Sequence, residues 1–403
     1  MTKSLMPLAE ALQFILAAVV PCKAVRDLPL SEALGRVLAQ TQRADMDVPA
    51  YDNSAMDGYA LNTRDVKVSG TRLPLSQTIA AGHPGQALAA GSIARIFTGA
   101  PIPEGADAVV MQENAVAEGS SIIINELPRT GQNVRLKGHD IARDTEVLSA
   151  GHRLQAQDLG LLASLGIDSV SVYHPLTVAI LNTGDEVIAP GTPLREGQLY
   201  DSNSYTLAGL LGRLGIHVIK LGIVEDNLAS TEAALKRAAV QADCIISTGG
   251  VSVGDEDHVK QALENLGQLS LWKLAIKPGK PFSFGSVGKT PFFGLPGNPV
   301  AVFVTFVTLV RPFLLRMQGA TNTDVPSFPV KAGFTISESG TRQEFLRVKL
   351  VRKGNEQVAE AFSDQGSSIL TSLSWADGLA IVPAHTTIEA GEPVEYLPFS
   401  GLL

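Results

Sequence analysis

The sequence has few charged residues and no excess of basic ones. Charged residues make up 18% of the 403 residues, and 40 acids against 32 bases leave a formal net charge of −8. A protein that binds nucleic acid needs a cationic surface to displace the counterions of the phosphates. The composition therefore argues against nucleic acid as a partner. Apolar residues reach 45%, which is too many for a disordered chain.

Cysteine is also scarce, which excludes a disulfide framework. The chain has only Cys22 and Cys244, far apart in the sequence. This usage is typical of a reducing compartment, and we expect a cytoplasmic protein. The sequence contains no C-x-x-C, H-x-x-x-H or G-x-S-x-G motif. Zinc chemistry and a serine hydrolase are therefore poorly supported.

A third absence is a hydrophobic run long enough to span a membrane. The longest candidate, 300–310, is interrupted by two threonines and is shorter than the ~20 residues that a spanning helix needs. The apolar stretch 14–22 superficially resembles a signal peptide, but Pro21 stands directly before the presumed cleavage point. The sequence therefore predicts a soluble protein without a membrane partner.

The length predicts two to four domains, at roughly 150 residues per domain. Residues 1–45 are predicted to be helical, with Ser31 capping a helix at 32–39. Helical spacing returns near 154–165, which predicts a discontinuous helical domain formed by 1–45 and 141–175. Between these segments, short β-prone runs separated by glycine and proline turns predict an inserted β-rich domain at 46–140.

Residues 176–324 alternate regularly between apolar strands and amphipathic helices. This pattern predicts a doubly wound, mostly parallel α/β domain with helices on both faces. The strands are predicted at 176–181, 216–224, 244–247 and 271–276, and a long apolar helix is predicted from Val300. From 325 to 403 the helical signal disappears and alternation predicts a β-barrel-like C-terminal domain. The predicted fold class is therefore multidomain α/β.

The chemistry is expected in the loops at the carboxyl ends of the strands, where parallel sheets bind ligands. Five such loops are expected at one edge: 182–186, 225–227, 248–257, 277–281 and 295–299. Acids crowd three of them, and carboxylates that lie close together need a cation to offset their repulsion. Hard oxygen ligands beside a glycine loop suit Mg²⁺ together with phosphate oxygens. The loops therefore predict a site for a phosphorylated ligand with Mg²⁺.

Each loop taken alone has a purely structural explanation. The glycine loop lacks the Lys-Ser/Thr of a P-loop, so it could be a packing turn. Asp226 and Asp257 could cap the following helices. Lys277 and Lys280 could be solvated charges, and 296–299 could be a rigid turn. That five loops at one edge carry such residues by chance is much less expected.

Six segments occur in the order found in a known family. They are SAMDGYA at 54–60, TGAP at 98–101, NTGDE at 182–186, TGGVSVGD at 248–255, IKPGKP at 276–281 and LPGNP at 295–299. With these segments the sequence resembles the molybdopterin molybdenumtransferases, the bacterial relatives of the gephyrin E domain. The resemblance runs from the N-terminal helix to the end of the chain.

The resemblance implies a four-part homodimer and the last step of molybdenum cofactor synthesis. In that step molybdate is inserted into adenylylated molybdopterin, with release of AMP, in the presence of Mg²⁺. A molybdopterin-adenylating protein and molybdoenzyme maturation factors become candidate partners. Two other functions stay open: a pterin adenylyltransferase on the same α/β domain, and a gephyrin-like scaffold that binds a receptor segment.

The resemblance also implies roles for individual residues. The catalytic residues would be Asp57, Asp226, Asp257, Lys277 and Lys280. The metal ligands would be Glu186, Asp226 and Asp257. The pterin nucleotide would be bound by Thr98, Arg135, Asp140, Thr183, Gly184, Asp185, Glu186, Gly249, Gly250, Ser252, Gly254, Pro296, Gly297, Asn298 and Pro299. Arg347 and Ser367 would help to bind molybdate. Of all these residues, those between 46 and 140 would come from the inserted domain and reach the partner's site.

Overall fold

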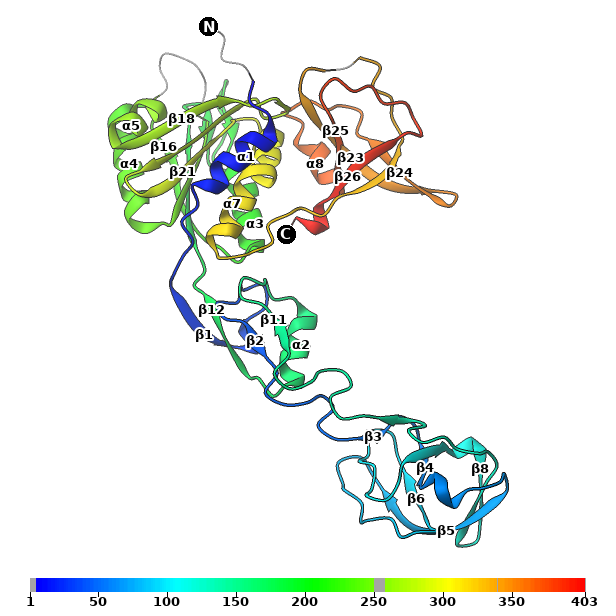
Figure 1. Cartoon of the computed structure of the whole chain (residues 1–403). Helices are drawn as coiled ribbons and strands as arrows, with labels where there is room; N and C mark the ends of the chain where they lie inside the picture. The colour runs from blue at the N-terminus through cyan, green and yellow to red at the C-terminus, as the bar shows by residue number, and fades with distance from the viewer. Residues whose placement is uncertain (1–4, 250–257, 339, 403) are drawn as a thin grey trace. The chain divides into compact units, whose positions relative to one another are not determined.

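The computed structural model describes residues 5–249, 258–338 and 340–402. The chain forms two compact units (Figure 1). Unit 1 comprises 1–39, 151–155 and 170–403, and unit 2 comprises 40–150 and 156–169. This division splits the predicted discontinuous domain between the two units. The boundaries expected for four domains remain predictions.

The centre of unit 1 is a six-stranded mixed sheet in the order β16-β13-β17-β21-β20-β18. Its strands are β13 (Thr177–Thr183), β16 (His217–Val224), β17 (Cys244–Thr248), β18 (Gly267–Lys273), β20 (Pro281–Val287) and β21 (Thr290–Leu295). β16, β13, β17 and β21 are parallel neighbours, whereas β20 is antiparallel to both β21 and β18. The expected parallel α/β core is therefore confirmed for four strands. The strand expected at 271–276 lies earlier in the chain, as β18, and the hairpin β20–β21 was not expected.

Helices cover both faces of this sheet (Figure 1). α1 (Leu8–Ala17), α3 (Asn203–Arg213) and the apolar helix formed by α6 (Pro299–Thr305), a π-helical turn (Phe306–Val310) and α7 (Arg311–Met317) pack on one face. α4 (Leu228–Gln241) and α5 (His258–Leu266) pack on the other. Adjacent residues of one strand, such as Ile180 and Leu181, enter opposite cores. Burial on both faces explains why the central strands β13 and β17 are nearly continuous apolar runs in the sequence.

The apolar helix corrects one expectation. It extends from Pro299 to Met317, has a mean hydropathy of 1.8 and is by length and composition able to cross a membrane. The expectation that no apolar segment is long enough was therefore wrong. However, 89% of its apolar window is buried inside unit 1, where Phe293 of the sheet packs against Phe313. This helix is a core helix of the α/β part.

A β-barrel-like module follows the apolar helix, as expected. It contains β22 (Phe328–Ala332), β23 (Gln343–Lys353), β24 (Glu356–Ala361), α8 (Leu370–Trp375), β25 (Gly378–Val382), β26 (Pro393–Pro398) and a 3₁₀ turn (Phe399–Gly401). The sheet runs β23-β24-β22-β26-β25 and closes because β25 also pairs with β23. The short strand β19 (Ile276–Lys277) belongs to the α/β part of the chain, yet it pairs in parallel with β23. One strand-end loop is thereby attached to the module.

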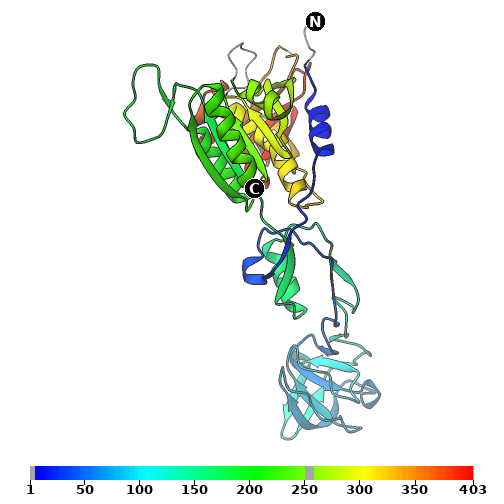
Figure 2. The same cartoon turned by 90° about the vertical axis from the view of Figure 1, so that its left-hand side faces the viewer.

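Unit 2 consists mainly of short β-strands, which are drawn in blue and cyan in Figure 2. Its strands and turns are β3 (Asn53–Ser54), β4 (Gly58–Leu61), a 3₁₀ turn (Thr63–Asp65), β5 (Thr71–Ile79), β6 (Ile93–Ile96), β7 (Ala108–Met111), a 3₁₀ turn (Gln112–Asn114), β8 (Ala115–Glu118), β9 (Ser121–Ile124) and β10 (Val134–Arg135). Six of the strands form a sheet in the order β7-β4-β6-β5-β9-β8. Adjacent residues such as Ala60 and Leu61 enter separate cores. β2 (Gln42–Arg43), β11 (Glu146–Leu148) and α2 (Ala156–Ser164) surround a third small core.

The N-terminal segment is less helical than expected. Besides α1 it contains β1 (Val25–Pro29), which pairs with β12 (Ser169–Tyr173), and a 3₁₀ turn (Leu30–Glu32). The helix predicted at 32–39, with its Ser31 cap, is absent. Gly35 adopts a φ of 74°, and the N–H groups of Gly35 and Leu38 donate to carbonyls of residues 154 and 152. These long-range hydrogen bonds replace the local ones of a helix.

Candidate functional site

The strand registers bring the expected loops to one edge of the sheet. Asn182 of β13 is opposite Thr248 of β17, and Thr248 is opposite Leu295 of β21. Pro281, where β20 begins, is opposite Lys273, where β18 ends. The segment 274–280 therefore lies at the carboxyl edge of the parallel strands, although it joins two antiparallel ones. We call this edge the carboxyl edge.

A pocket of about 490 Å³ opens at the carboxyl edge, and we call it the strand-end pocket. Its lining comes from three loops, the start of α3 and the segment before α8. The lining residues are Asn182, Thr183, Glu186, Val187, Leu199, Tyr200, Asp201, Ser202, Asn203, Thr248, Gly249, Gly297, Asn298, Pro299, Ser368 and Leu370. Six expected site residues are among them: Thr183, Glu186, Gly249, Gly297, Asn298 and Pro299.

A buried polar network forms the floor of the strand-end pocket. Asn182 Oδ1 accepts a hydrogen bond from Thr248 Oγ1 at 2.5 Å, and Asn182 Nδ2 donates to Ser204 Oγ at 2.8 Å. The Ser204 N–H donates to Asp201 Oδ1 at 2.9 Å. Each of these four residues is at most 9% exposed. The network therefore fixes β13, β17 and the start of α3 relative to one another.

Two glycines of the pocket loops occupy places where a side chain does not fit. Gly249 has a φ of +81°, and a Cβ there would lie 2.8 Å from the Thr183 carbonyl oxygen. Gly184 has a φ of +132°, and the Glu186 carboxylate lies where its Cβ would point, with Oε2 2.6 Å away. The Glu186 carboxylate therefore folds back over the loop that bears it. The glycines are required by the geometry of the loops and are not interchangeable with other residues.

The loop before the apolar helix is held by amide side chains. Asn203 Nδ2 donates to the Gly297 carbonyl at 2.7 Å, and Asn298 Nδ2 donates to Ser367 Oγ at 3.0 Å. The Val300 N–H donates to the Ser367 carbonyl. These bonds connect α3, the 296–299 loop and the segment before α8 around one pocket. The loop is thus more than a rigid turn into a helix.

The expected acidic centre is described only in part. Glu186 and Asp226 are exposed and follow adjacent strands, since Thr183 is opposite Val224. Asn227 caps α4 by accepting the Ser230 N–H at 2.8 Å, so Asp226 is not needed as the cap. Asp185 is exposed as well. Within residues 5–249, 258–338 and 340–402 no group of three or more His, Cys, Asp or Glu side chains is placed to hold a metal.

Several expected residues lie outside the described residues. They are Gly250, Ser252, Gly254 and Asp257. The structure therefore describes the third loop only at Gly249, and the expected metal triad only at Glu186 and Asp226. Both carboxylates supply the hard oxygen donors that Mg²⁺ prefers.

The two expected lysines differ in their surroundings. Lys277 is the last residue of β19, and its Nζ lies 3.2 Å from both carboxylate oxygens of Glu344 in the C-terminal module. Lys280 is exposed and, within the described part of the chain, forms no ion pair. A half-exposed ion pair such as Lys277–Glu344 contributes at most about 1 kcal/mol, so an incoming anion can compete with it.

Arg347 is a buried cation beneath the segment before α8. It is 1% exposed, and its guanidinium donates to Ser372 Oγ at 3.0 Å and to the carbonyls of Gly366 and Phe345. All of these acceptors are neutral. Burial lowers the pKa of Arg347 to about 10, with Asp364 opposing the shift, so the side chain stays charged at neutral pH. Its positive charge is therefore not neutralised by a hydrogen-bonded carboxylate.

The four expected residues of the inserted domain lie in unit 2. Asp57 Oδ1 accepts hydrogen bonds from the Thr98 N–H at 2.7 Å and from Thr98 Oγ1 at 2.8 Å. The backbone N–H of Thr98 is the main cause that lowers the pKa of Asp57. Asp57 and Thr98 thus form one local pair. Arg135, in β10, and Asp140 are exposed.

The sequence interpretation missed the pocket residues at 199–203. They reach the pocket because β14 (Val187–Ile188) pairs in parallel with β15 (Leu199–Tyr200). The Asp201 N–H donates to the Ile188 carbonyl, which returns the chain to the strand end after the loop 189–198. Asp-Ser-Asn-Ser at 201–204, directly before a helical pattern, is a typical helix N-terminus and was the available signal.

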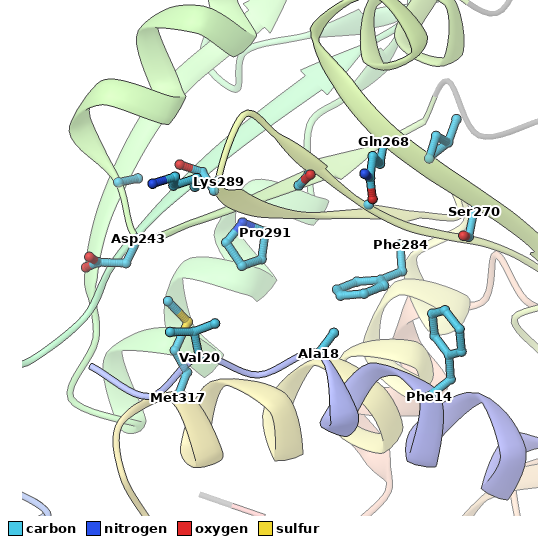
Figure 3. A pocket seen from close by; sticks show the side chains of 15 residues that line it. Phe14, Ala18, Val20, Asp243, Gln268, Ser270, Phe284, Lys289, Pro291 and Met317 are labelled. Carbon is cyan, nitrogen blue, oxygen red and sulfur yellow. The ribbon is translucent and has the colours of Figure 1, made fainter. Parts of the chain in front are cut away.

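A second pocket of about 490 Å³ lies at the opposite, amino edge of the same sheet (Figure 3). Asp243 directly precedes β17, and Lys289 lies in the turn before β21. Phe14 of α1 meets the ring of Phe284 edge-on, with centroids 6.4 Å apart. No residue expected to bind substrate or metal lines this amino-edge pocket.

Three family models match consecutive parts of the chain. Models described as "MoeA N-terminal region (domain I and II)", "Probable molybdopterin binding domain" and "MoeA C-terminal region (domain IV)" match residues 6–166, 179–316 and 329–399. The second match contains most of the strand-end pocket.

Relatives match over nearly the whole chain. A molybdopterin molybdenumtransferase of Haemophilus influenzae is 41% identical over 93% of this chain and 94% of its own length. The enzyme of the same name from a Nostoc species is 37% identical over 90% of this chain and 86% of its own. A molybdopterin biosynthesis moeA protein from Pyrococcus horikoshii superposes with a TM-score of 0.85 at 29% identity, covering 98% of this chain and 100% of that one.

These matches define the chain first as a transferase of molybdenum cofactor biosynthesis. More narrowly, it belongs to the molybdopterin molybdenumtransferase family. The resemblance read from the six motifs is thereby confirmed at the level of the family. Its fold, with mixed sheets and a β-barrel-like module, is that of the family as well.

Proposed function

We propose that this protein inserts molybdate into adenylylated molybdopterin and releases AMP, in a Mg²⁺-dependent reaction. The observation that carries the proposal is the strand-end pocket, which lies where parallel α/β sheets bind ligands and mostly within the segment that matches a probable molybdopterin-binding domain. The substrates are molybdate and the adenylylated pterin.

The proposed roles of the residues around the pocket follow from their charges. Glu186 and Asp226 would hold Mg²⁺, which in such sites usually has one or two protein carboxylates and several phosphate oxygens. When bound, Mg²⁺ polarises a phosphoanhydride and offsets the charge that develops on it. Asp257, the third ligand that the family resemblance implies, lies outside the described residues.

The cations would bind the anionic substrates. Lys280 is exposed and can approach an anion. Lys277 can replace its ion pair with Glu344 by one with a bound anion. Arg347 is a buried charge whose hydrogen-bond acceptors are all neutral, with Asp364 as its nearby carboxylate, and it bonds the Gly366 carbonyl next to Ser367 on the segment that borders the pocket. A buried cation without a hydrogen-bonded carboxylate favours an anion such as molybdate, which supports the proposed binding role of Arg347 and Ser367.

The inserted domain would act on the site of a partner in a homodimer. Asp57, Thr98, Arg135 and Asp140 lie in unit 2, whereas the pocket lies wholly in unit 1. Mixing Asp57→Ala chains with Asp257→Ala chains, each expected to be inactive alone, tests this arrangement. A shared site gives each mixed dimer one intact site, and random pairing then restores roughly a quarter of wild-type activity. No recovery after confirmed subunit exchange would exclude the shared site.

The direct test of the reaction is AMP release. The protein is incubated in cytoplasm-like reducing buffer with adenylylated molybdopterin, molybdate and Mg²⁺, and AMP is measured. We expect release that needs all three. Consumption of ATP without AMP release would favour a pterin adenylyltransferase, and no turnover at all would favour a scaffold. Interaction with a molybdopterin-adenylating protein or with molybdoenzyme maturation factors is compatible with this function.

A further inference from the structure

The strand-end pocket is rich in hydrogen-bond acceptors, and the described residues that line it include no cation. Its lining includes the carboxylates of Glu186 and Asp201, and no Lys, Arg or His is among the lining residues. A phosphate or molybdate bound there alone would face two carboxylates. The lining therefore suits a part of the substrate that donates hydrogen bonds, and the anionic groups belong beside the lysines and Arg347.

Two of the acceptors lie at the start of α3. Asp201 lines the pocket, is 9% exposed and accepts the Ser204 N–H through Oδ1, so its second carboxylate oxygen is the one offered to a ligand. Asn203 donates through Nδ2 to Gly297, and its Oδ1 is buried without a partner in the same part of the chain. Because the buried Asn203 Oδ1 lacks a donor among the described residues, a ligand that supplies one there gains binding energy, and the Asp201 carboxylate adds a charged acceptor beside it.

The lining of the same pocket also includes large apolar side chains. Leu199, Tyr200 and Leu370 line the pocket, yet they are 50%, 41% and 37% exposed. Large apolar side chains left exposed around a recess are typical of a surface that a flat ligand covers. These side chains and the acceptors together fit a bicyclic ring with donors along one edge.

We propose that Asp201 and Asn203 recognise the pterin ring of the substrate. The inference rests on the proposed function, and it names the part of the substrate that enters the strand-end pocket. A pterin presents its 2-amino group and N3–H side by side, which is a two-donor edge. Adenine presents one amino donor beside a ring nitrogen that accepts, so it matches these two acceptors less well. The adenylate would then lie away from Asp201.

The test compares pterin with lumazine, in which a carbonyl oxygen replaces the 2-amino group. Binding of each compound is measured by its own fluorescence, in EDTA without Mg²⁺, so that a metal-binding role of Asp201 does not contribute. Wild type should prefer pterin by about 10- to 100-fold, the usual range for a hydrogen bond to a charged group. Asp201→Asn should weaken pterin binding by a similar factor and reduce or reverse the preference.

Asparagine at 201 can still accept the Ser204 N–H, so the start of α3 should be preserved. Lumazine binding reports on the fold, because a misfolded pocket loses both ligands. Glu196→Gln is the matched control: Glu196 is exposed on the loop 189–198 and removing its charge should leave the preference unchanged.

Three results would overturn the inference: equal binding of pterin and lumazine by wild type, an unaltered preference in Asp201→Asn, or an equal loss in Glu196→Gln. Absence of pterin binding at millimolar concentration would also count against it. AMP release by wild type is measured in parallel. AMP release without an Asp201-dependent preference refutes only this inference, whereas the preference without AMP release refutes only the proposed function.

Discussion

The two edges of the central sheet carry pockets of the same volume, about 490 Å³, but of different chemistry. At the carboxyl edge, glycine loops, carboxylates and amide side chains converge because four parallel strands end there. At the amino edge, the pocket lies between α1 and short turns, and Phe14 and Phe284 form its apolar side (Figure 3). Volume therefore does not identify the site, whereas the direction of the strands does.

The largest expected effect comes from a pair of glycines, one at each edge. Gly249→Ala should lower the rate of AMP release by about 100-fold or more, because its Cβ would push against the Thr183 carbonyl and displace the pocket loop. Gly288, in the turn before β21, also has a positive φ but has open space around it. Gly288→Ala should cost about 1 kcal/mol of stability and leave the rate unchanged. Equal rates of AMP release by Gly249→Ala and Gly288→Ala would contradict the proposed difference between the two edges.

Substituting one carboxylate at each edge should show that activity and stability depend on different residues. Asp226→Ala should abolish most Mg²⁺-dependent AMP release and change the free energy of unfolding by less than about 0.5 kcal/mol, since Asp226 is exposed and caps no helix. Asp243 at the amino edge accepts the Thr177 N–H at 2.7 Å. Asp243→Ala should therefore lose about 1 kcal/mol of stability with normal turnover. Urea unfolding and AMP assays on both variants provide the measurement, and normal turnover by Asp226→Ala contradicts the metal assignment.

A pair of lysines tests anion binding. Lys280→Ala should raise the molybdate concentration for half-maximal rate by about 10- to 100-fold, with a further rise in salt. Lys289→Ala at the amino edge removes the same charge from an exposed position and should have no such effect. An unchanged molybdate dependence in Lys280→Ala would make Lys280 a solvated loop charge.

A strand of the fold could be predicted from the sequence where its own residues form a clear pattern, and not where distant contacts determine it. β13 and β17 were predicted because strands buried on both faces are continuous apolar runs, and β16 was predicted although, as an edge strand, it buries only Val224. The hairpin β20–β21 was missed because Gly285 and Gly294 interrupt its apolar pattern. Gly285 is required by tertiary contact: a Cβ there would lie 2.1 Å from the Gln268 carbonyl oxygen.

Prediction of the site residues from the sequence had the same limit. Gly249 and Glu186 were found through motifs directly after predicted strands, and the 296–299 loop through a motif directly before the predicted apolar helix. Asp201 and Asn203 were not, since they return to the pocket through two-residue strands that leave no periodic signal. The burial of Arg347 was also unexpected, because the alternation of β23 places it opposite the apolar residues Leu346 and Val348.

The smallest expected effect concerns Asp57 in unit 2. Asp57 accepts hydrogen bonds from Thr98 within its own unit, whereas the carboxylates compared above lie at the two edges of the central sheet of unit 1. Thr98 holds the pKa of Asp57 below its usual value of 3.8. Its contribution to stability is therefore present above about pH 4 and is lost as the pH falls through the lowered pKa. The Tm difference between wild type and Asp57→Asn should be small but positive at pH 6 and should vanish near pH 2. A difference that grows on acidification would contradict this assignment.

The most direct test of the central claim is hydrogen exchange, read by mass spectrometry, with and without adenylylated molybdopterin. The account predicts slower exchange in peptides that cover 182–187, 199–204 and 296–300 at the carboxyl edge. Peptides that cover 267–270 and 285–291 at the amino edge should exchange at the same rate in both samples. Protection confined to the amino edge, or no protection at the carboxyl edge under saturating substrate, would contradict the assignment of the site.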